Sequence, residues 1–550
     1  MRQWFKSGSP WVWLNAAAVS TSLILVFGLL LMIAVRGLGH FWPAAVVKLE
    51  YQEKNGQTQT LIGEISETTL MTAKRARDAG YQFSADIDTL VQYLIKAGNR
   101  DLTGMDFRWI LEKNIIQKEY PPEIMVVERR EWGNFYGFLT AVKEQGKIIA
   151  SGSRAWPVAQ QRLQRVLQII GRIKDLEKKQ IGAINYNLEK LRLKKKRLQL
   201  EKQWGPGPEQ QLAMEKKAYE ARYAELQTQL VDLYRQINRD SLVATAAGGR
   251  ELQIPLAKVV RIYQPNAMTL PEKVIHYFGK GWEFLSTDPR EANTEGGVFP
   301  AIFGTVMMVM IMSVIVTPFG VIAAVYLREY AKQGFVTRLI RIAVNNLAGV
   351  PSIVYGVFGL GFFVYILGGN IDRLFFPEAL PSPTFGTPGL LWASITLALL
   401  TLPVVIVSTE EGLSRIPKSI REGSLALGAT KLETLWHTVL PMASPAMMTG
   451  LILAVARAAG EVAPLMLVGV VKLAPTLPLD GNFPFLHLDR KFMHLGFHIY
   501  DVGFQSPNVE AARPLVYATS LLLVAVIIGL NLAAIAIRNR LREKFRALEN

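Results

Sequence analysis

The segment REGSLALGATKLETLWHTVLP, residues 421–441, lies between two long apolar runs and is itself amphipathic. Its leucines recur among charged residues, and Gly428 permits a tight backbone turn because glycine has no Cβ. We therefore predict two short helices joined by a turn within the loop 409–442. A helix–turn–helix held between two membrane spans can receive a push from a partner and pass it to those spans.

Outside this loop, much of the sequence consists of apolar runs of membrane-spanning length. Half of the 550 residues are hydrophobic, and a helix needs about 20 mostly apolar residues to cross a bilayer. The predicted spans are 11–35, 298–327, 340–367, 389–408, 443–471 and 514–537. The first run is too long for a signal peptide and no cleavage site follows it, so we expect it to stay as an anchor.

The positions of lysine and arginine predict the orientation of these spans. Basic residues cluster after the second span, after the fourth span and in the C-terminal tail, and such clusters mark the cytoplasmic side. Both terminal segments, 1–10 and 538–550, are therefore expected on the cytoplasmic side of the membrane. Residues 36–297 are then expected in the periplasm, since long domains cross largely regardless of charge.

Residues 36–297 have the sequence of a soluble domain with two β-rich parts and a helical middle. Alternating apolar residues predict strands over about 44–150 and 248–270, with a type I′ turn at Asn55-Gly56. Between them, 158–240 consists of helix formers with leucine and isoleucine at three- and four-residue steps, interrupted by WGPGP at 204–208. This pattern predicts an antiparallel coiled-coil hairpin. The fold class is thus an all-α membrane protein with six spans and an inserted α+β domain.

Two further features limit the chemistry of the chain. It has no cysteine, which excludes disulfides, zinc–thiolate sites and cysteine nucleophiles. We attribute its formal charge of +16 to residues that flank the spans and to the basic run 190–197. That run keeps the helical leucine spacing, so a solvated helix face is expected rather than a surface for nucleic acid or acidic lipid.

The opening segment resembles the cytoplasmic loop of ABC-importer permeases. In that family an E-x-x-x-x-x-G core is followed by an apolar position and Leu-Pro, and Ser424 departs from the family's usual Glu-Ala-Ala opening. The residues that the resemblance assigns to coupling with an ATPase are Glu422, Gly428, Ala429, Leu440 and Pro441. The permease fold that the resemblance implies covers 298–537 and the first anchor, but not the large inserted domain.

Two other stretches resemble the phosphate-specific permeases of the PstA type: NNLAGVPSIVYGVFGLGF, 345–362, and AVARAAGEVAPLMLVG, 454–469. The resemblance implies an importer of inorganic phosphate with three kinds of partner: a second, homologous permease subunit, an ATP-binding cassette ATPase dimer and a periplasmic phosphate-binding protein. No G-x-x-x-x-G-K-[ST] pattern occurs in the chain. We therefore expect no cofactor on this chain, and ATP and Mg²⁺ to be used by the partner ATPase.

Arg457 and Glu461 lie within the fifth predicted span, four residues apart. Positions i and i+4 share a helix face, and a charge at the bilayer centre costs roughly 2.5–3.5 kcal/mol on insertion scales. One hypothesis is that Arg457 grips a phosphate through two parallel hydrogen bonds, while Glu461 competes with the anion and permits its release. The alternative is an ion pair that only orders the span.

The third predicted span contains a second candidate element of the substrate path. Gly349 and Pro351 interrupt it, and a broken helix exposes N–H groups that favour anions. Asn345, Asn346 and Ser352 are further candidate donors. A packing kink with a small-residue interface explains the same residues equally well.

The loop 472–513 contains a group of three histidines, His487, His494 and His498. The last two have the spacing of metal ligands on a helix. Because no thiol and few carboxylates accompany them, we expect an amphipathic outer helix and no metal site.

These observations predict a transport subunit without its own ATPase site, which works by alternating access. Any tetrahedral oxyanion would suit one arginine and a helix end, so sulfate, molybdate and phosphonate stay open as substrates. A membrane-anchored scaffold or sensor that acts through its coiled coil is a hypothesis from another class. It predicts spans without interior polar groups, and Arg457, Glu461 and the turn at Gly428 argue against it.

Overall fold

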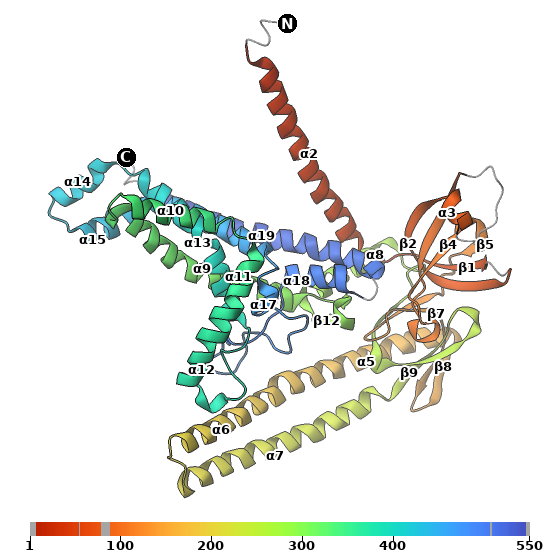
Figure 1. The fold of residues 1–550 in the computed structure, drawn as a ribbon. Helices are drawn as coiled ribbons and strands as arrows, with labels where there is room; N and C mark the ends of the chain where they lie inside the picture. Colours follow the sequence, from red (N-terminus) through yellow and green to blue (C-terminus); the bar gives the residue numbers. More distant parts are fainter. Residues whose placement is uncertain (1–6, 54–55, 79–87, 507–508, 546–550) are drawn as a thin grey trace. The chain divides into compact units, whose positions relative to one another are not determined.

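The computed structural model describes residues 7–53, 56–78, 88–506 and 509–545. The chain divides into two compact units, one formed by Met1–His40 with Val298–Asn550 and the other by Phe41–Gly297. We call the first the membrane unit and the second the inserted domain (Figure 1).

The membrane unit is helical. Among the described residues, six helices are long and apolar enough to cross a membrane: Pro10–Gly39, Phe299–Tyr330, Ser352–Phe375, Leu390–Ser414, Lys431–Gly460 and Ala512–Arg540. Its elements are α2 (Ser9–Gly39), α9 (Phe299–Val325), α10 (Phe335–Leu347), α11 (Ser352–Phe358), α12 (Gly369–Phe375), α13 (Leu390–Ser414), α14 (Lys418–Ala426), α15 (Lys431–Thr434), α16 (Leu440–Gly460), α17 (Leu465–Val468), α18 (Leu495–Tyr500) and α19 (Val509–Phe545). Short π-helical segments continue several of them: η7 (Tyr326–Tyr330), η8 (Gly359–Gly368), η10 (Leu435–Val439) and η11 (Asp501–Gln505).

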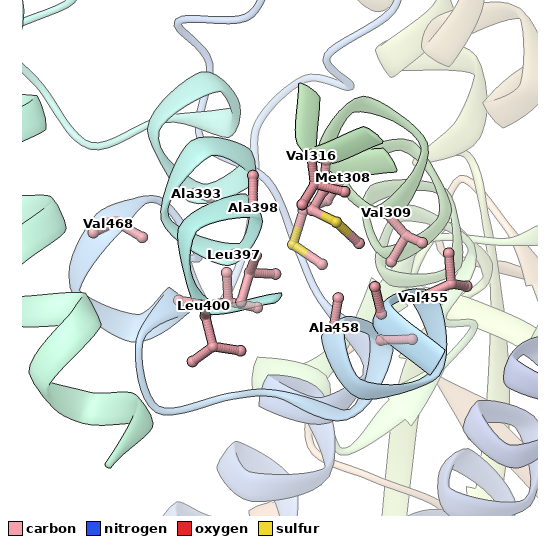
Figure 2. Close-up of a cluster of buried hydrophobic side chains, with 14 of the residues drawn as sticks. Met308, Val309, Val316, Ala393, Leu397, Ala398, Leu400, Val455, Ala458 and Val468 are labelled. Carbon is pink, nitrogen blue, oxygen red and sulfur yellow. The ribbon is translucent and has the colours of Figure 1, made fainter. Parts of the chain in front are cut away.

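The core of the membrane unit lies where α9, α13 and α16 meet. Buried side chains from all three helices form one cluster, which includes Met308, Leu397 and Ala458 (Figure 2). Small residues allow the helices to approach closely. A Cβ added at Gly450 of α16 would lie 2.6 Å from the Cβ of Ser408 on α13, so this contact depends on glycine.

The first span, α2, packs on the last one, α19. The guanidinium of Arg36 donates to the Tyr517 hydroxyl at 3.3 Å and lies over its ring. A Cβ added at Gly37 would lie 2.9 Å from the Tyr517 carbonyl oxygen. The first apolar run therefore belongs to the membrane unit although the inserted domain separates it from the other spans in sequence.

The inserted domain contains two antiparallel sheets. A five-stranded antiparallel sheet has the order β4-β3-β2-β1-β5, and a six-stranded one has the order β10-β9-β7-β6-β11 with β8 beside β7. The strands are β1 (Val46–Gln52), β2 (Thr58–Thr72), β3 (Thr89–Lys96), β4 (Phe107–Leu111), β5 (Ile115–Glu119), β6 (Met125–Arg129), β7 (Phe135–Glu144), β8 (Lys147–Ser151), β9 (Asp240–Thr245), β10 (Glu251–Pro255) and β11 (Val259–Tyr263). The predicted hairpin between β1 and β2 is present, but Asn55 of its predicted turn lies outside the described residues.

Two long helical arms extend from the second sheet (Figure 1). The outgoing arm is α5 (Ala155–Asp175), a π-helical segment η3 (Leu176–Ile181) and α6 (Gly182–Leu200); the returning arm is α7 (Pro206–Ile237). Leu176, Ile184 and Leu226 are buried between them. The arms form an antiparallel helical hairpin, and its description as a coiled coil stays a prediction.

Three local predictions are wrong. The third span begins at Ser352 and not at 340, because the preceding residues form the separate helix α10. The helix of the fifth span ends at Gly460 and does not reach 471. The histidine region is not an amphipathic outer helix: α18 has six residues, and His494 and His498 are fully buried.

Candidate functional site

The loop between α13 and α16 contains the predicted helix–turn–helix. The helix α14 ends at Ala426, and the backbone then turns at Gly428, whose φ is +90°. Thr430 and Glu433 cap the start of α15 reciprocally: the Thr430 N–H donates to the Glu433 carboxylate at 2.7 Å, and the Glu433 N–H donates to the Thr430 hydroxyl at 3.3 Å. This capping box fixes where the second helix begins.

The residues that the resemblance assigned to coupling lie along this loop. Glu422 is exposed on α14, Gly428 and Ala429 form the turn, and Leu440 and Pro441 open α16 after the π-helical segment η10. The departure from the family pattern, Ser424, has a structural use here. Its hydroxyl lies 2.9 Å from that of Thr434, so the two short helices are joined by a hydrogen bond.

The loop is attached to η7, the π-helical segment that continues α9, by two basic residues that the sequence analysis did not assign to coupling. Arg421 forms an ion pair with Glu329 at 2.9 Å and donates to the carbonyl groups of Ile416 and Leu413. Lys431 donates to the Glu329 carbonyl and lies 4.4 Å from the ring centroid of Tyr330. A movement of α14 or α15 would therefore be transmitted to α9. The sequence feature that could have indicated this attachment is Glu329, an acidic residue among basic residues at the end of the second span.

The loop exposes several large apolar side chains. Leu427 is 91% exposed, and Leu425, Leu432 and Trp436 are exposed as well. Exposed apolar side chains gathered on one short segment mark a surface for a protein partner.

Arg457 and Glu461 are paired, but not on one continuous helix. Arg457 lies in the last turn of α16, whereas Glu461 follows the helix with an extended backbone at φ −78° and ψ 136°. The helix ends here because Pro464 has no N–H to donate to the carbonyl of Gly460, and glycine itself is a weak helix former. The predicted common helix face is thus wrong, although the ion pair forms.

The geometry of this pair leaves much of the arginine available. The Nε of Arg457 lies 3.5 Å from the Glu461 carboxylate, with the two side chains 35% and 20% exposed. No hydrogen bond of the described residues uses either Nη group of Arg457. The guanidinium can therefore donate to a further oxyanion without first breaking its existing ion pair.

The candidate donors of the third span are divided between two elements. Asn345 and Asn346 are exposed on α10, outside the span, and Ser352 is half-buried at the start of α11. Pro351 cannot donate to the Leu347 carbonyl, which accepts from the Val350 N–H at 3.2 Å and from the Tyr355 hydroxyl at 2.6 Å. None of the three candidates forms a described hydrogen bond to Arg457 or Glu461.

The breaks in the third and fifth spans nevertheless lie side by side. A Cβ added at Gly356 of α11 would lie 2.7 Å from the Cα of Pro464, just after Glu461. Tyr355, Ala458 and Leu465 belong to the same buried cluster. The structure thus brings the two interrupted helices together, with the Arg457–Glu461 pair at their junction.

Comparison with known proteins identifies this architecture. Residues 316–547 match the family described as "Binding-protein-dependent transport system inner membrane component". The phosphate transport system permease protein PstA of Mycobacterium leprae is 35% identical over 245 residues, which cover 44% of this chain and 71% of that protein. The chain belongs to this family as a PstA-type permease.

Other relatives agree with this assignment. PstA 1 of Mycobacterium tuberculosis is 36% identical, over 44% of this chain and 71% of that protein. The probable ABC transporter permease protein YqgI of Bacillus subtilis is 30% identical, over 46% of this chain and 81% of that protein. A solved structure of the MetNI methionine ABC transporter is 19% identical, over 50% of this chain and 99% of that one, with a TM-score of 0.33. The family match, the PstA relatives and the six apolar helices make this PstA-type permease a multi-pass membrane subunit of an ABC importer.

Proposed function

We propose that this PstA-type permease forms part of the path by which an ATP-driven importer carries inorganic phosphate across the inner membrane. The observation that carries the proposal is the likeness to phosphate transport permeases, at 35–36% identity over most of their length. The arginine at the junction of two broken helices supplies chemistry that suits a phosphate. The same chemistry would suit sulfate, molybdate or phosphonate, so these anions are the alternatives that a test must separate.

In the proposed path, the free Nη groups of Arg457 meet the anion as it passes. A guanidinium donates two parallel hydrogen bonds to a phosphate. Glu461 is already 3.5 Å from the Nε of the same guanidinium, so its negative charge repels the anion and keeps the site from holding it permanently. Ser352, Asn345 and Asn346 are proposed as further donors along the entry to this site, on the two sides of the break before α11.

We propose that the loop around Gly428 couples the ATPase to the membrane helices. We propose that an ATPase dimer, which uses ATP and Mg²⁺, docks on the exposed leucines of this loop, and that this chain hydrolyses nothing itself. Closure of the dimer would move α14 and α15, and the Arg421–Glu329 ion pair would pass that movement to α9. Because α9 shares its core with α13 and α16, the helices around the anion site would rearrange and expose it alternately to the two sides.

The proposed assembly contains a second, homologous permease subunit and a periplasmic phosphate-binding protein that delivers the anion. We propose that both termini lie in the cytoplasm and the inserted domain in the periplasm, because basic residues cluster at the span ends on one side. We also propose that the helical hairpin of the inserted domain is a coiled coil that serves recruitment of a partner or regulation, and not the transport step.

Uptake measurements in a strain lacking only this chain test the proposal. Loss of radiolabelled phosphate uptake with unchanged sulfate uptake, restored by the wild-type gene, is the expected result. Loss of sulfate uptake with normal phosphate uptake would contradict the phosphate assignment. Normal uptake of every oxyanion would favour a scaffold or sensor.

A further inference from the structure

The helix α8 (Leu270–Ser286) of the inserted domain turns its apolar face outward. Thr269 and Glu272 form a capping box at its start, so its first turn is firmly defined. Leu270, Ile275, Phe278 and Trp282 are each 68–72% exposed. The last three recur at three- and four-residue steps and therefore form one stripe along the helix.

The polar face of the same helix points into its own domain. Lys280 forms an ion pair with Glu128, and Glu283 pairs with both Arg261 at 2.8 Å and Arg290 at 2.7 Å. These carboxylates are nearly buried, since the side chains of Glu128 and Glu283 are 5% and 13% exposed. Such an arrangement fixes the rotation of α8 about its axis, so the helix cannot turn its apolar stripe inward without breaking three ion pairs.

A helix with this orientation is inverted relative to the usual surface helix of a soluble domain. In water, the apolar stripe faces a protein core and the charged residues face solvent. Here the stripe contains two aromatic residues, Phe278 and Trp282, whose side chains would be exposed to water if the domain were surrounded by solvent. An outward apolar stripe of this size indicates a surface that contacts lipid or another protein.

The two chain connections between the inserted domain and the spans both lie close to α8 in the fold of the domain. The first span, α2, ends at Gly39, and Phe41 follows two residues later with its ring 5.3 Å from that of Phe284. At the other end of the domain, the N–H of Gly297 donates to the carbonyl of Asp288, just after α8, at 3.2 Å. The second span, α9, begins two residues later, at Phe299. Both connections from the inserted domain to a membrane span therefore start beside α8.

We propose that α8 lies along the membrane surface, with Ile275, Phe278 and Trp282 inserted among the lipid headgroups and the first part of the acyl chains. An amphipathic helix with Trp and Phe on its apolar face is suited to this position, and tryptophan is enriched at membrane interfaces. Its role is to anchor the inserted domain at a fixed height and rotation, which goes beyond the transport function proposed above. Lipid is favoured over a protein occupant because both membrane connections of the domain begin at this helix.

Site-directed fluorescence tests this proposal, since the natural chain has no cysteine. Phe278→Cys is introduced into the full chain, labelled with bimane and placed in lipid nanodiscs with its importer partners. Two matched variants give the reference values: Leu25→Cys in the middle of α2 and Met214→Cys on α7. The native side chains of Leu25 and Met214 are 67% and 68% exposed. Quenching is measured with lipids brominated on their acyl chains and with aqueous iodide.

We expect the label at 278 to be quenched by the brominated lipids, as at position 25, and to be protected from iodide relative to position 214. Ile275→Cys is expected to behave in the same way, which guards against a local effect at one site. Quenching by iodide alone, as at position 214, would overturn the proposal. Protection from both quenchers would also overturn it, because it would mean that a protein partner covers the stripe.

Discussion

At the scale of single residues, the turn at Gly428 requires a conformation that L-residues with side chains avoid. Its φ is +90°, and a Cβ added there would meet no atom within 4 Å. Substitution therefore costs backbone strain of about 1–2 kcal/mol without a steric clash. We expect Gly428→Val to reduce ATP-dependent uptake while the protein still inserts, because a β-branched residue is poorly suited to this turn.

The matched control is Gly423→Val on α14, where a Cβ is also unobstructed but φ is not positive. Both variants are assayed for uptake and for co-purification with the ATPase. Full uptake by Gly428→Val, equal to that of the control, would remove this turn from the coupling mechanism.

His494 provides a residue-scale prediction about pH. It lies outside the six spanning helices, its Nδ1 accepts from the Gly496 N–H at 3.1 Å, and complete burial lowers its pKa to about 3. Between the ordinary pKa of 6.5 and about 3, the unfolded chain binds a proton at this residue that the folded chain does not. Stability is therefore lost as the pH falls below 6.5, by up to about 1.4 kcal/mol per pH unit.

We expect His494→Asn to reduce this loss, because asparagine retains an acceptor for the Gly496 N–H but does not titrate. Thermal unfolding of the detergent-solubilised protein is measured at pH 7 and pH 5, with wild type alongside. An equal drop in Tm for both proteins would show that His494 is not responsible.

At the scale of elements, the attachment of α14 to η7, which continues α9, depends on the Arg421–Glu329 ion pair. Its side chains are only 18% and 13% exposed, so removal of one partner leaves the other charge unpaired in a partly buried place. Breaking a fully buried pair costs roughly 3–5 kcal/mol, and the cost here is expected to be smaller. We expect Glu329→Gln to lower uptake per assembled complex, and the exchange Glu329→Arg with Arg421→Glu to restore part of it. Arg415→Gln is the control, because its pair with Glu411 is exposed.

Unchanged uptake by Glu329→Gln at normal complex levels would mean that force reaches the spans by another route. The exchange variant distinguishes loss of the pair from loss of a single side chain. The exchange keeps one positive and one negative side chain at the two positions. Among the described residues, it also removes the hydrogen bonds from Arg421 to the carbonyls of Ile416 and Leu413.

The sequence predicted some elements well and others poorly, for physical reasons. Hydropathy over about 20 residues identified all six spans, and the small size of glycine identified the turn at Gly428. The break between α10 and α11 was predicted from Gly349 and Pro351, but the span was started too early, at 340, because apolar residues of α10 such as Ile340 were counted with it. The end of α16 before Glu461 was missed because spacing alone suggested a continuous helix, although Gly460 and Pro464 carried the signal.

Contacts between distant segments were beyond the sequence. The Arg421–Glu329 pair joins residues 92 positions apart, and no periodic pattern connects them. The same is true of α8, whose inward charges are recognisable only once Glu128 and Arg290 are placed beside it. The candidate site could thus be predicted as a set of residue types, but not as the junction of two broken helices.

At the scale of the whole molecule, the helical hairpin is expected to be separable from transport. Its two arms run antiparallel and return the chain to the same sheet, where β8 and β9 both pair with β7. We expect a deletion of 158–240, closed by a short flexible linker, to leave an inserted permease that transports at a normal maximal rate. This deletion removes Ala159, Val166 and Ile237, which belong to the core of the second sheet. A shorter deletion of 177–233 keeps these three residues and is the control for loss of that core.

The two deletions are compared by membrane content, co-purification with the partner permease and uptake. Failure of the shorter deletion to insert or to assemble would mean that the hairpin is structural and that the modular description is wrong.

The central claim, that phosphate passes Arg457, is tested most directly by phosphate uptake in the double variant Arg457→Gln with Glu461→Gln, normalised to the assembled complex in the membrane. If Arg457 contacts the anion, Arg457→Gln and the double variant should both assemble normally and fail to take up phosphate, and Glu461→Gln alone should be milder. If the pair only orders the span, each single change leaves a charge without its partner, and the double change removes that defect. Normal assembly without uptake in the double variant is the result we predict, and recovered uptake would contradict the account.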